Sequence, residues 1–249
     1  MGTVLRLGWL EIKLFLREPM TAVTALALPL VLLFILGGVF GDQPSAPGEE
    51  VVWRGQGPMS YYVPAYLVLA TVAVCLISIP THLAGDRERG VLRRYRASAL
   101  GPWAIAGAEL AVALAVSIAS TVVLLAGAAL VYDFRWPERP LVSALAFLAI
   151  VVGYTGIGLL LSALAPTARA AQSIGLILWF VMMLVGGAGP PEEVLTGPMR
   201  AVSLATPMLH TVRMLHQPWL GLAPGWSWLV FALMATVSGA LGLLLFRWE

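Results

Sequence analysis

Residues 61–83 read YYVPAYLVLATVAVCLISIPTHL, and hydroxyl groups and His82, near the end, are the only polar interruptions. A helix of roughly 20 residues crosses the hydrocarbon core of a bilayer, which is about 30 Å thick. Water is absent there, so each backbone polar group must be satisfied within the segment, as a helix does and an open strand does not. This stretch therefore predicts a transmembrane helix and sets the class of fold.

Five other stretches have the same continuous apolar character, without the alternation typical of membrane β-barrels. Of the 249 residues, 59% are hydrophobic and 11% charged, whereas an ordinary soluble domain has about 25% charged residues. A soluble enzyme is therefore excluded, and we predict an all-α polytopic membrane protein with a single transmembrane domain over residues 1–249. The six predicted spans are 21–40, 61–83, 102–131, 141–164, 171–189 and 226–246.

Arginine and lysine are distributed unevenly between the two sides that six spans define. Ten of them lie on the side of both termini and five on the other. Basic residues concentrate on the cytoplasmic side of membrane proteins. We therefore expect both termini in the cytoplasm, in a multi-pass protein of the cell membrane, in particular the bacterial inner (plasma) membrane.

The segment 4–18 has the pattern of an amphipathic helix. Leu5, Trp9 and Ile12 fall on one face, and Arg6 and Lys13 lie together on another. This pattern predicts a helix in the cytoplasmic interface, with its basic face toward anionic lipids. The alternative is a charged extension of the first span.

The segment 85–100 is the most highly charged part of the chain, with seven charges in the eleven residues of 86–96. Asp86 and Glu88 come first and Arg93, Arg94 and Arg96 later, an order that suits the dipole of one short helix. We predict such a helix, with the acidic pair near its N-terminus. The alternative is a solvated loop that only sets the topology.

The region 190–224 is too long for a hairpin and too apolar for free solvent. Glu192, Glu193 and several prolines divide it, so that 194–204 and 208–215 are predicted as short helices that cannot span. Re-entrant or interfacial helices on the extracellular side fit this pattern best.

Several kinds of chemistry are excluded. The only lysine, Lys13, follows no glycine-rich loop, so the chain has no P-loop for ATP. His82, His210 and His216 have no common metal-ligand spacing, and no catalytic constellation or nucleic-acid footprint is present. We therefore assign no catalytic residue, metal or nucleic-acid partner. Glu109, near the start of the third span, is either functional or solvated at the interface.

Three features, in this order, resemble the membrane subunits of type 2 ABC exporters, particularly the drug-export permeases of the daunorubicin type. The first is the amphipathic segment 5–17 followed by Glu18-Pro19, which is similar to the family's elbow helix. The second is DRERGVLRRYRA at 86–97, followed by a proline at position 102, which is similar to the first cytoplasmic loop. The third is the region from Gly186-Gly187 through 190–193 to Thr206-Pro207 and Arg213, where threonine replaces the family's usual asparagine.

The resemblance implies a half-transporter that pairs with a second permease, either an identical copy or a paralogue. Two copies of a separate ATPase would dock in the cytoplasm and bind the ATP and Mg²⁺, so this chain would hold no cofactor. An amphiphilic or hydrophobic substrate would move outward between the protomers, along spans two and five and the re-entrant helices. The expected coupling residues are Asp86, Arg87, Glu88, Arg89, Val91, Leu92, Arg93, Arg94, Tyr95 and Arg96, and the expected pathway residues are Tyr62, Tyr66, Trp179, Phe180 and Met183.

Two other function classes remain open. A secondary transporter would need ionisable groups near the bilayer centre or inverted repeats with broken helices, and the spans contain no central Asp, Glu, Lys or Arg. A non-transport scaffold is the other alternative, and no feature of the sequence points specifically to it.

Overall fold

The computed structural model describes residues 19–40, 57–132 and 134–248, which form helices and connecting turns without a strand. The segment 4–18, predicted to be an amphipathic helix, lies outside the described residues. Several helices begin with proline in the first turn, where its missing N–H would have no helical partner anyway. The elements are α2 (Pro19–Phe40), α3 (Pro58–Ala73), the π-helical turn η1 (Val74–Ser78), α4 (Ile79–Glu88), α5 (Val91–Ala97), α6 (Pro102–Val131), α7 (Pro140–Leu164), α8 (Ala168–Val185), the 3₁₀ turn η2 (Glu192–Val194), α9 (Gly197–Ala205), α10 (Pro207–Trp219) and α11 (Ser227–Leu244).

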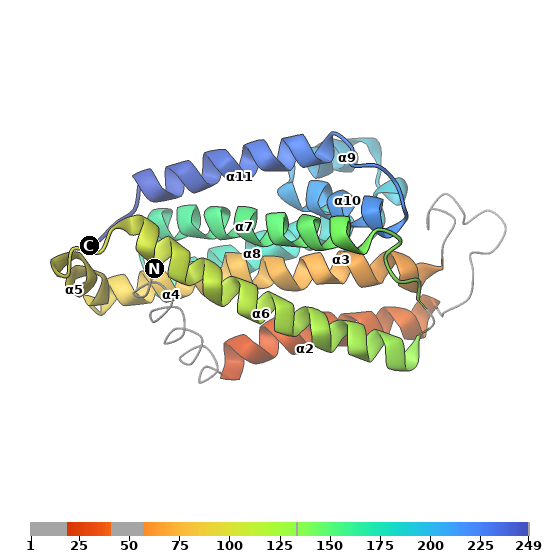
Figure 1. Cartoon of the computed structure of the whole chain (residues 1–249), viewed down its shortest axis with the longest axis horizontal. Helices are drawn as coiled ribbons and strands as arrows, with labels where there is room; N and C mark the ends of the chain where they lie inside the picture. The colour runs from red at the N-terminus through yellow and green to blue at the C-terminus, as the bar shows by residue number, and fades with distance from the viewer. Residues whose placement is uncertain (1–18, 41–56, 133, 249) are drawn as a thin grey trace.

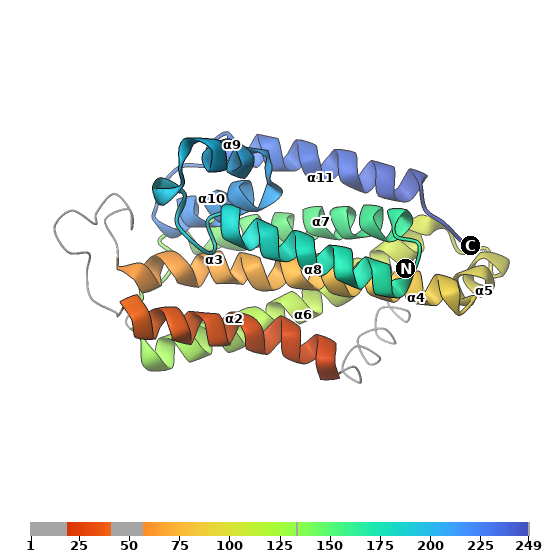
Figure 2. The same ribbon diagram turned by 180° about the vertical axis from the view of Figure 1, so that it is seen from behind.

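The centre of the bundle is one long helix made of α3, η1 and α4. It runs without a break from Pro58 to Glu88, and every residue of α3 is buried. Figures 1 and 2 show it lying along the long axis, with α7 and α8 beside it and α2 and α6 on another side. The stretch 61–83 is thus the core of the fold, as well as a membrane span.

At the π-helical turn in this central helix, α7 and α8 approach its backbone closely. Ile79 donates to the carbonyl of Val74, five residues back, and in that register Cys75 would need an N–H from Pro80, which has none. Gly158 of α7 and Gly175 of α8 lie against the carbonyl oxygens of Cys75 and Leu76, which a Cβ at either glycine would overlap. The absence of side chains there lets both helices pack against the backbone of the bulge.

Small residues also join α7 to α11. A Cβ on Gly156 would lie 3.0 Å from the Cα of Gly239, and one on Gly242 would lie 2.8 Å from the backbone nitrogen of Leu160. Glycine faces of this kind let membrane helices approach closely and gain van der Waals contact. They hold α11, most of whose surface is exposed, against the rest of the bundle.

Five of the six predicted spans are confirmed as helices long and apolar enough to cross a membrane. The second extends beyond its predicted limits, to Pro58 and Glu88, and the fifth ends four residues early, at Val185, before Gly187, which has a φ of +82°. The predicted span 21–40 lies in α2, within which Pro29–Val39 is a shorter apolar helix. The sixth crossing therefore stays a prediction.

The charged segment 85–100 differs from the single helix that we predicted. Gly90 has a φ of +70° and separates α4 from α5, so Asp86 and Glu88 end one helix rather than begin another. The prediction of one helix with an acidic N-terminus is wrong, because the left-handed Gly90 ends α4 after the acidic pair and a separate helix begins at Val91. The acidic pair instead stays with the central helix.

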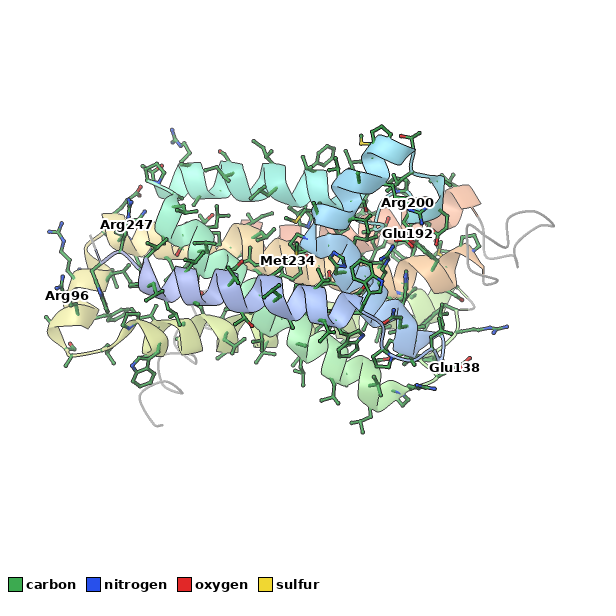
Figure 3. All side chains as sticks on the ribbon, turned by 90° about the horizontal axis from the view of Figure 1, so that it is seen from above. Arg96, Glu138, Glu192, Arg200, Met234 and Arg247 are labelled. Carbon is green, nitrogen blue, oxygen red and sulfur yellow. The ribbon has the colours of Figure 1, made fainter. Side chains whose placement is uncertain are left out.

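The polar residues gather at the two ends of the bundle. In Figure 3, Arg96 and Arg247 lie at one end, and Glu138, Glu192 and Arg200 at the other. We call the first the α5 end and the second the α10 end, after the short helices found there (Figure 1).

Candidate functional site

Helix α5 presents part of the charged segment to solvent. Arg94 and Arg96 are exposed, and within the described part of the chain neither makes an ion pair. Arg93 and Arg89 are also exposed, whereas Val91 and Tyr95 are half-buried. Leu92 is only 1% exposed and packs into the chain's own core, so it fixes α5 to the bundle instead of facing a partner.

Two adjacent residues at the end of α4 are turned toward the loop between α7 and α8. The Arg87 guanidinium donates to the carbonyl of Ser162 at 2.9 Å, to that of Ala165, and to that of Pro166 at 3.3 Å. The Glu88 carboxylate accepts a hydrogen bond of 3.0 Å from the backbone N–H of Ala168, the first residue of α8. These two members of the predicted coupling set therefore bind their own chain.

A second polar contact joins α4 to α6. His82 Nδ1, on α4, lies 2.8 Å from Glu109 Oε1, on α6. Asp86, one turn after His82, accepts a 2.8 Å hydrogen bond from Arg89 at the end of α4. Glu109 is 4% exposed, so the alternative that it is solvated at the interface is wrong. A buried carboxylate requires a partner, and His82 supplies one from the neighbouring helix.

The five predicted pathway residues do not share one surface. Tyr62, Tyr66 and Trp179 are buried inside the protomer, and the Trp179 indole N–H donates to the carbonyl of Leu69 at 3.1 Å. Phe180 is 50% exposed on α8, and Met183 is half-buried beside it. Of these five residues, only Phe180 and Met183, both on α8, have side chains accessible at the surface of the described chain.

The α10 end is built from the region 190–224. The two short helices predicted there are present as α9 and α10, which begin and end a few residues from the predicted limits. Helix α10 is almost wholly buried, and His216 Nε2 contacts the carbonyl of Tyr61 at 2.8 Å, tying α10 to the start of the central helix.

A buried ion pair fixes α10 to the preceding turn. Arg213 reaches Glu192 Oε2 through Nε at 2.8 Å and through a terminal nitrogen at 2.7 Å. The guanidinium carbon lies 5.6 Å from the centre of the Trp226 ring, against which His210 packs edge-on. Burial lowers the pKa of His210, and the nearby Arg213 charge acts in the same direction.

The described residues contain no group of three or more His, Cys, Asp or Glu placed to hold a metal ion. The polar contacts described above connect helices to one another and do not converge on a common binding site. The described chain is therefore a helical membrane bundle held by interhelical polar contacts, with a charged helix at one end.

A family model for the ABC-2 type transporter matches residues 3–218, which is most of the chain. The chain belongs to this family. No curated protein matches it. It is thus the permease subunit of an ABC transporter and a multi-pass membrane protein, from a family that is a membrane component of transport and not a catalytic one. ABC-2 permeases generally work with an ATPase subunit and dimerise.

Sequence reasoning missed the partners of several charged residues in this ABC-2 permease. Glu109 and His82 are separated by 27 positions, and Glu192 and Arg213 by 21. The one available signal was that an acidic and a basic group in apolar surroundings each require a partner. Nothing in the sequence pointed to the carbonyls bound by Arg87, because any residue can supply a carbonyl.

Proposed function

We propose that this chain is the membrane-spanning subunit of an ATP-driven exporter, in which a separate ATPase moves an amphiphilic or hydrophobic substrate outward. Drugs, antibiotics, lipids and glycans belong to that substrate class. The daunorubicin-type resemblance of the sequence supports drug efflux, with antibiotic resistance as one outcome. The single observation that carries the proposal is the α5 end, where exposed arginines stand on a helix joined directly to the central helix.

The proposed orientation places the α5 end in the cytoplasm. Of the described arginines, seven lie at this end (87, 89, 93, 94, 96, 169 and 247) and four at the other (135, 139, 200 and 213). The positive-inside rule then supports cytoplasmic termini. The proposed location is the bacterial inner membrane. The α10 end, with its two short helices, would face outward as a re-entrant cap.

The proposed partner is an ABC ATPase, present in two copies, that binds the ATP and Mg²⁺. Arg94 and Arg96 would meet acidic groups of that ATPase, and the half-buried Val91 and Tyr95 would pack against it. Charged pairs at such a contact mainly set orientation and association rate, whereas apolar anchors supply affinity. Arg93 and Arg89 flank this surface.

The proposed complex contains a second permease, identical or paralogous, with the substrate route between the two. The exposed face of α8 supports this assignment, because it carries Phe180 and Met183 and no charge between Gln172 and Val185. A hydrophobic lining recognises area and shape, which favours broad selectivity. Tyr62, Tyr66 and Trp179 would join this route only in a conformation that uncovers α3.

The experiment is reconstitution with a candidate ATPase whose gene lies beside that of the permease. We expect a stable complex, and ATP hydrolysis stimulated by a panel of amphiphilic compounds. Each exposed ion pair is worth about 0.2–1 kcal/mol, so the double variant R94A/R96A should bind the ATPase about two- to thirtyfold more weakly.

The matched control is Arg200→Ala, which removes an exposed arginine from the opposite end (Figure 3). It should bind the ATPase like the wild type. If R94A/R96A and R200A bind equally well, α5 is not the docking surface. A wild-type chain that purifies and transports without any ATPase would favour a secondary transporter instead.

A further inference from the structure

Arg87 and Glu88 together occupy both sides of the loop that joins α7 to α8. The carbonyls that Arg87 binds belong to the last turn of α7 and to the loop residues Ala165 and Pro166. The N–H that donates to Glu88 belongs to Ala168, the first residue of α8. A single dipeptide of α4 thus binds the end of one helix and the beginning of the next.

Each contact satisfies groups that a helix leaves open. The last carbonyls of a helix and its first N–H groups have no partner within the helix. A guanidinium suits the negative end of α7 and a carboxylate suits the positive end of α8. Thr167 supplies a second cap to α8 by accepting from the N–H of Ala170 at 3.1 Å.

The same dipeptide is the last part of α4 before the turn into α5. Two residues beyond Glu88, Gly90 takes its left-handed conformation, and α5 begins at Val91. Leu92 then holds α5 in the core. Arg87 and Glu88 therefore lie between α5 and the α7–α8 loop along the chain and contact that loop directly.

We propose that Arg87 and Glu88 are positioning residues that make the α7–α8 loop move as one body with α5. This inference rests on the proposed function, in which the ATPase acts on α5. A movement that the ATPase imposes on α5 would then reach three elements together: the central helix, α7 and α8. Because α8 also presents Phe180 and Met183, a movement at the ATPase would be passed to the proposed substrate route.

The first test measures the distance between α5 and α8. Ser98 and Gln172 are exposed, and Cys75, the only native cysteine, is completely buried. Spin labels on S98C and Q172C would report the distance by pulsed electron resonance, in the permease alone and in its complex with the ATPase, before and after vanadate trapping. The expected result is one narrow distribution, with the same mean in every state.

The double variant R87A/E88A should broaden this distribution and let its mean change on trapping. Glu88→Gln is the conservative rescue, because its amide oxygen still accepts from Ala168, and it should keep the narrow distribution. Arg89→Ala is the matched control, because it removes a neighbouring arginine that binds Asp86 and not the loop. Should the double variant fail to fold, Glu88→Ala alone removes one side of the contact and keeps the other.

The second test separates docking from coupling. R87A/E88A leaves Arg94 and Arg96 in place, so it should bind the ATPase as the wild type does. Its stimulation of ATP hydrolysis should fall by about two- to thirtyfold, the range expected for the loss of two partly exposed charged contacts. Glu88→Gln should restore most of the stimulation, which a loss of overall stability would not explain.

Two results would overturn the inference. One is an unchanged distance distribution in R87A/E88A, and the other is a broadened distribution with wild-type stimulation. If the wild-type permease neither binds nor stimulates an ATPase, the proposed function fails and the role in coupling fails with it. The distances in the permease alone would still show whether the two residues hold the loop.

Discussion

The ion pair between Glu192 and Arg213 offers the most direct test of how the α10 end is held together. Both hydrogen bonds from Arg213 converge on one carboxylate oxygen, at 2.8 and 2.7 Å, and the two side chains are only 10% and 15% exposed. Removing one partner of a fully buried pair costs about 3–5 kcal/mol, because the other charge stays buried without compensation. The residual exposure of both groups places Arg213→Met near the lower limit, at about 3 kcal/mol.

The double variant E192Q/R213M should behave differently. It removes both charges, so it should cost less than Arg213→Met alone, which leaves the Glu192 charge buried without a partner. The assay is titration with sodium dodecyl sulfate in dodecylmaltoside micelles, followed by helical ellipticity, for the wild type, both single variants and the double variant. Cleavage by protease within 190–224 would show whether the α10 end opens before the rest.

Arg200→Met is the control for this cycle, because it removes an exposed arginine at the same end (Figure 3). It should cost less than about 0.5 kcal/mol. The reasoning is refuted if Arg213→Met costs no more than this control, since the pair would then act as a surface ion pair. Strict additivity of the two single variants would refute it as well.

Three further predictions concern packing, pH and orientation. Gly175→Ala should lose about 1–3 kcal/mol in the same titration, because its methyl group overlaps the Leu76 carbonyl, whereas Gly38→Ala, which meets no atom within 4 Å, should be nearly neutral. The pKa of His210 in the folded chain lies below its ordinary value of 6.5, so the unfolded chain binds a proton there more readily. The melting temperature should therefore fall as the pH drops below about 6.5. His210→Gln should reduce this dependence of the melting temperature on pH. A membrane-impermeant maleimide should label a cysteine at exposed position 138 in intact cells and one at position 98 only after permeabilisation; labelling in the opposite order would invert the proposed orientation.

Much of the fold follows from the composition of single segments. A run of apolar residues long enough to cross a bilayer has to be helical wherever it lies in the bundle, and Pro102 and Pro140 mark helix starts by their missing N–H. The start and end of α6 therefore agree with prediction to the residue, and α9 and α10 were expected from the prolines that divide 190–224. The resemblance to type 2 ABC permeases, likewise visible in the sequence, agrees with the family match.

The limits of local reasoning show in the segment 85–100. Charge order suggested one helix and passed over Gly90, which follows the C-cap residue Arg89 and takes the left-handed conformation that commonly ends a helix. The sequence also gave Arg87 and Glu88 the same standing as Arg94 and Arg96, since all four are charged residues in one short stretch. Only the folded chain distinguishes Arg87 and Glu88, which bind the α7–α8 loop, from Arg94 and Arg96, which do not.

Hydropathy, proline position and charge bias thus determined by themselves that this is a helical membrane protein and where most of its helices lie, because each depends on a segment and its solvent. Only the tertiary structure decided which span is central, which carboxylates are buried, and which charges join one helix to another. Those properties depend on contacts between residues far apart in the sequence, such as Glu109 with His82 and Glu192 with Arg213. A transmembrane helix has the same apolar composition whether lipid or other helices surround it. The sequence of 61–83 therefore does not indicate that this span is buried within the bundle.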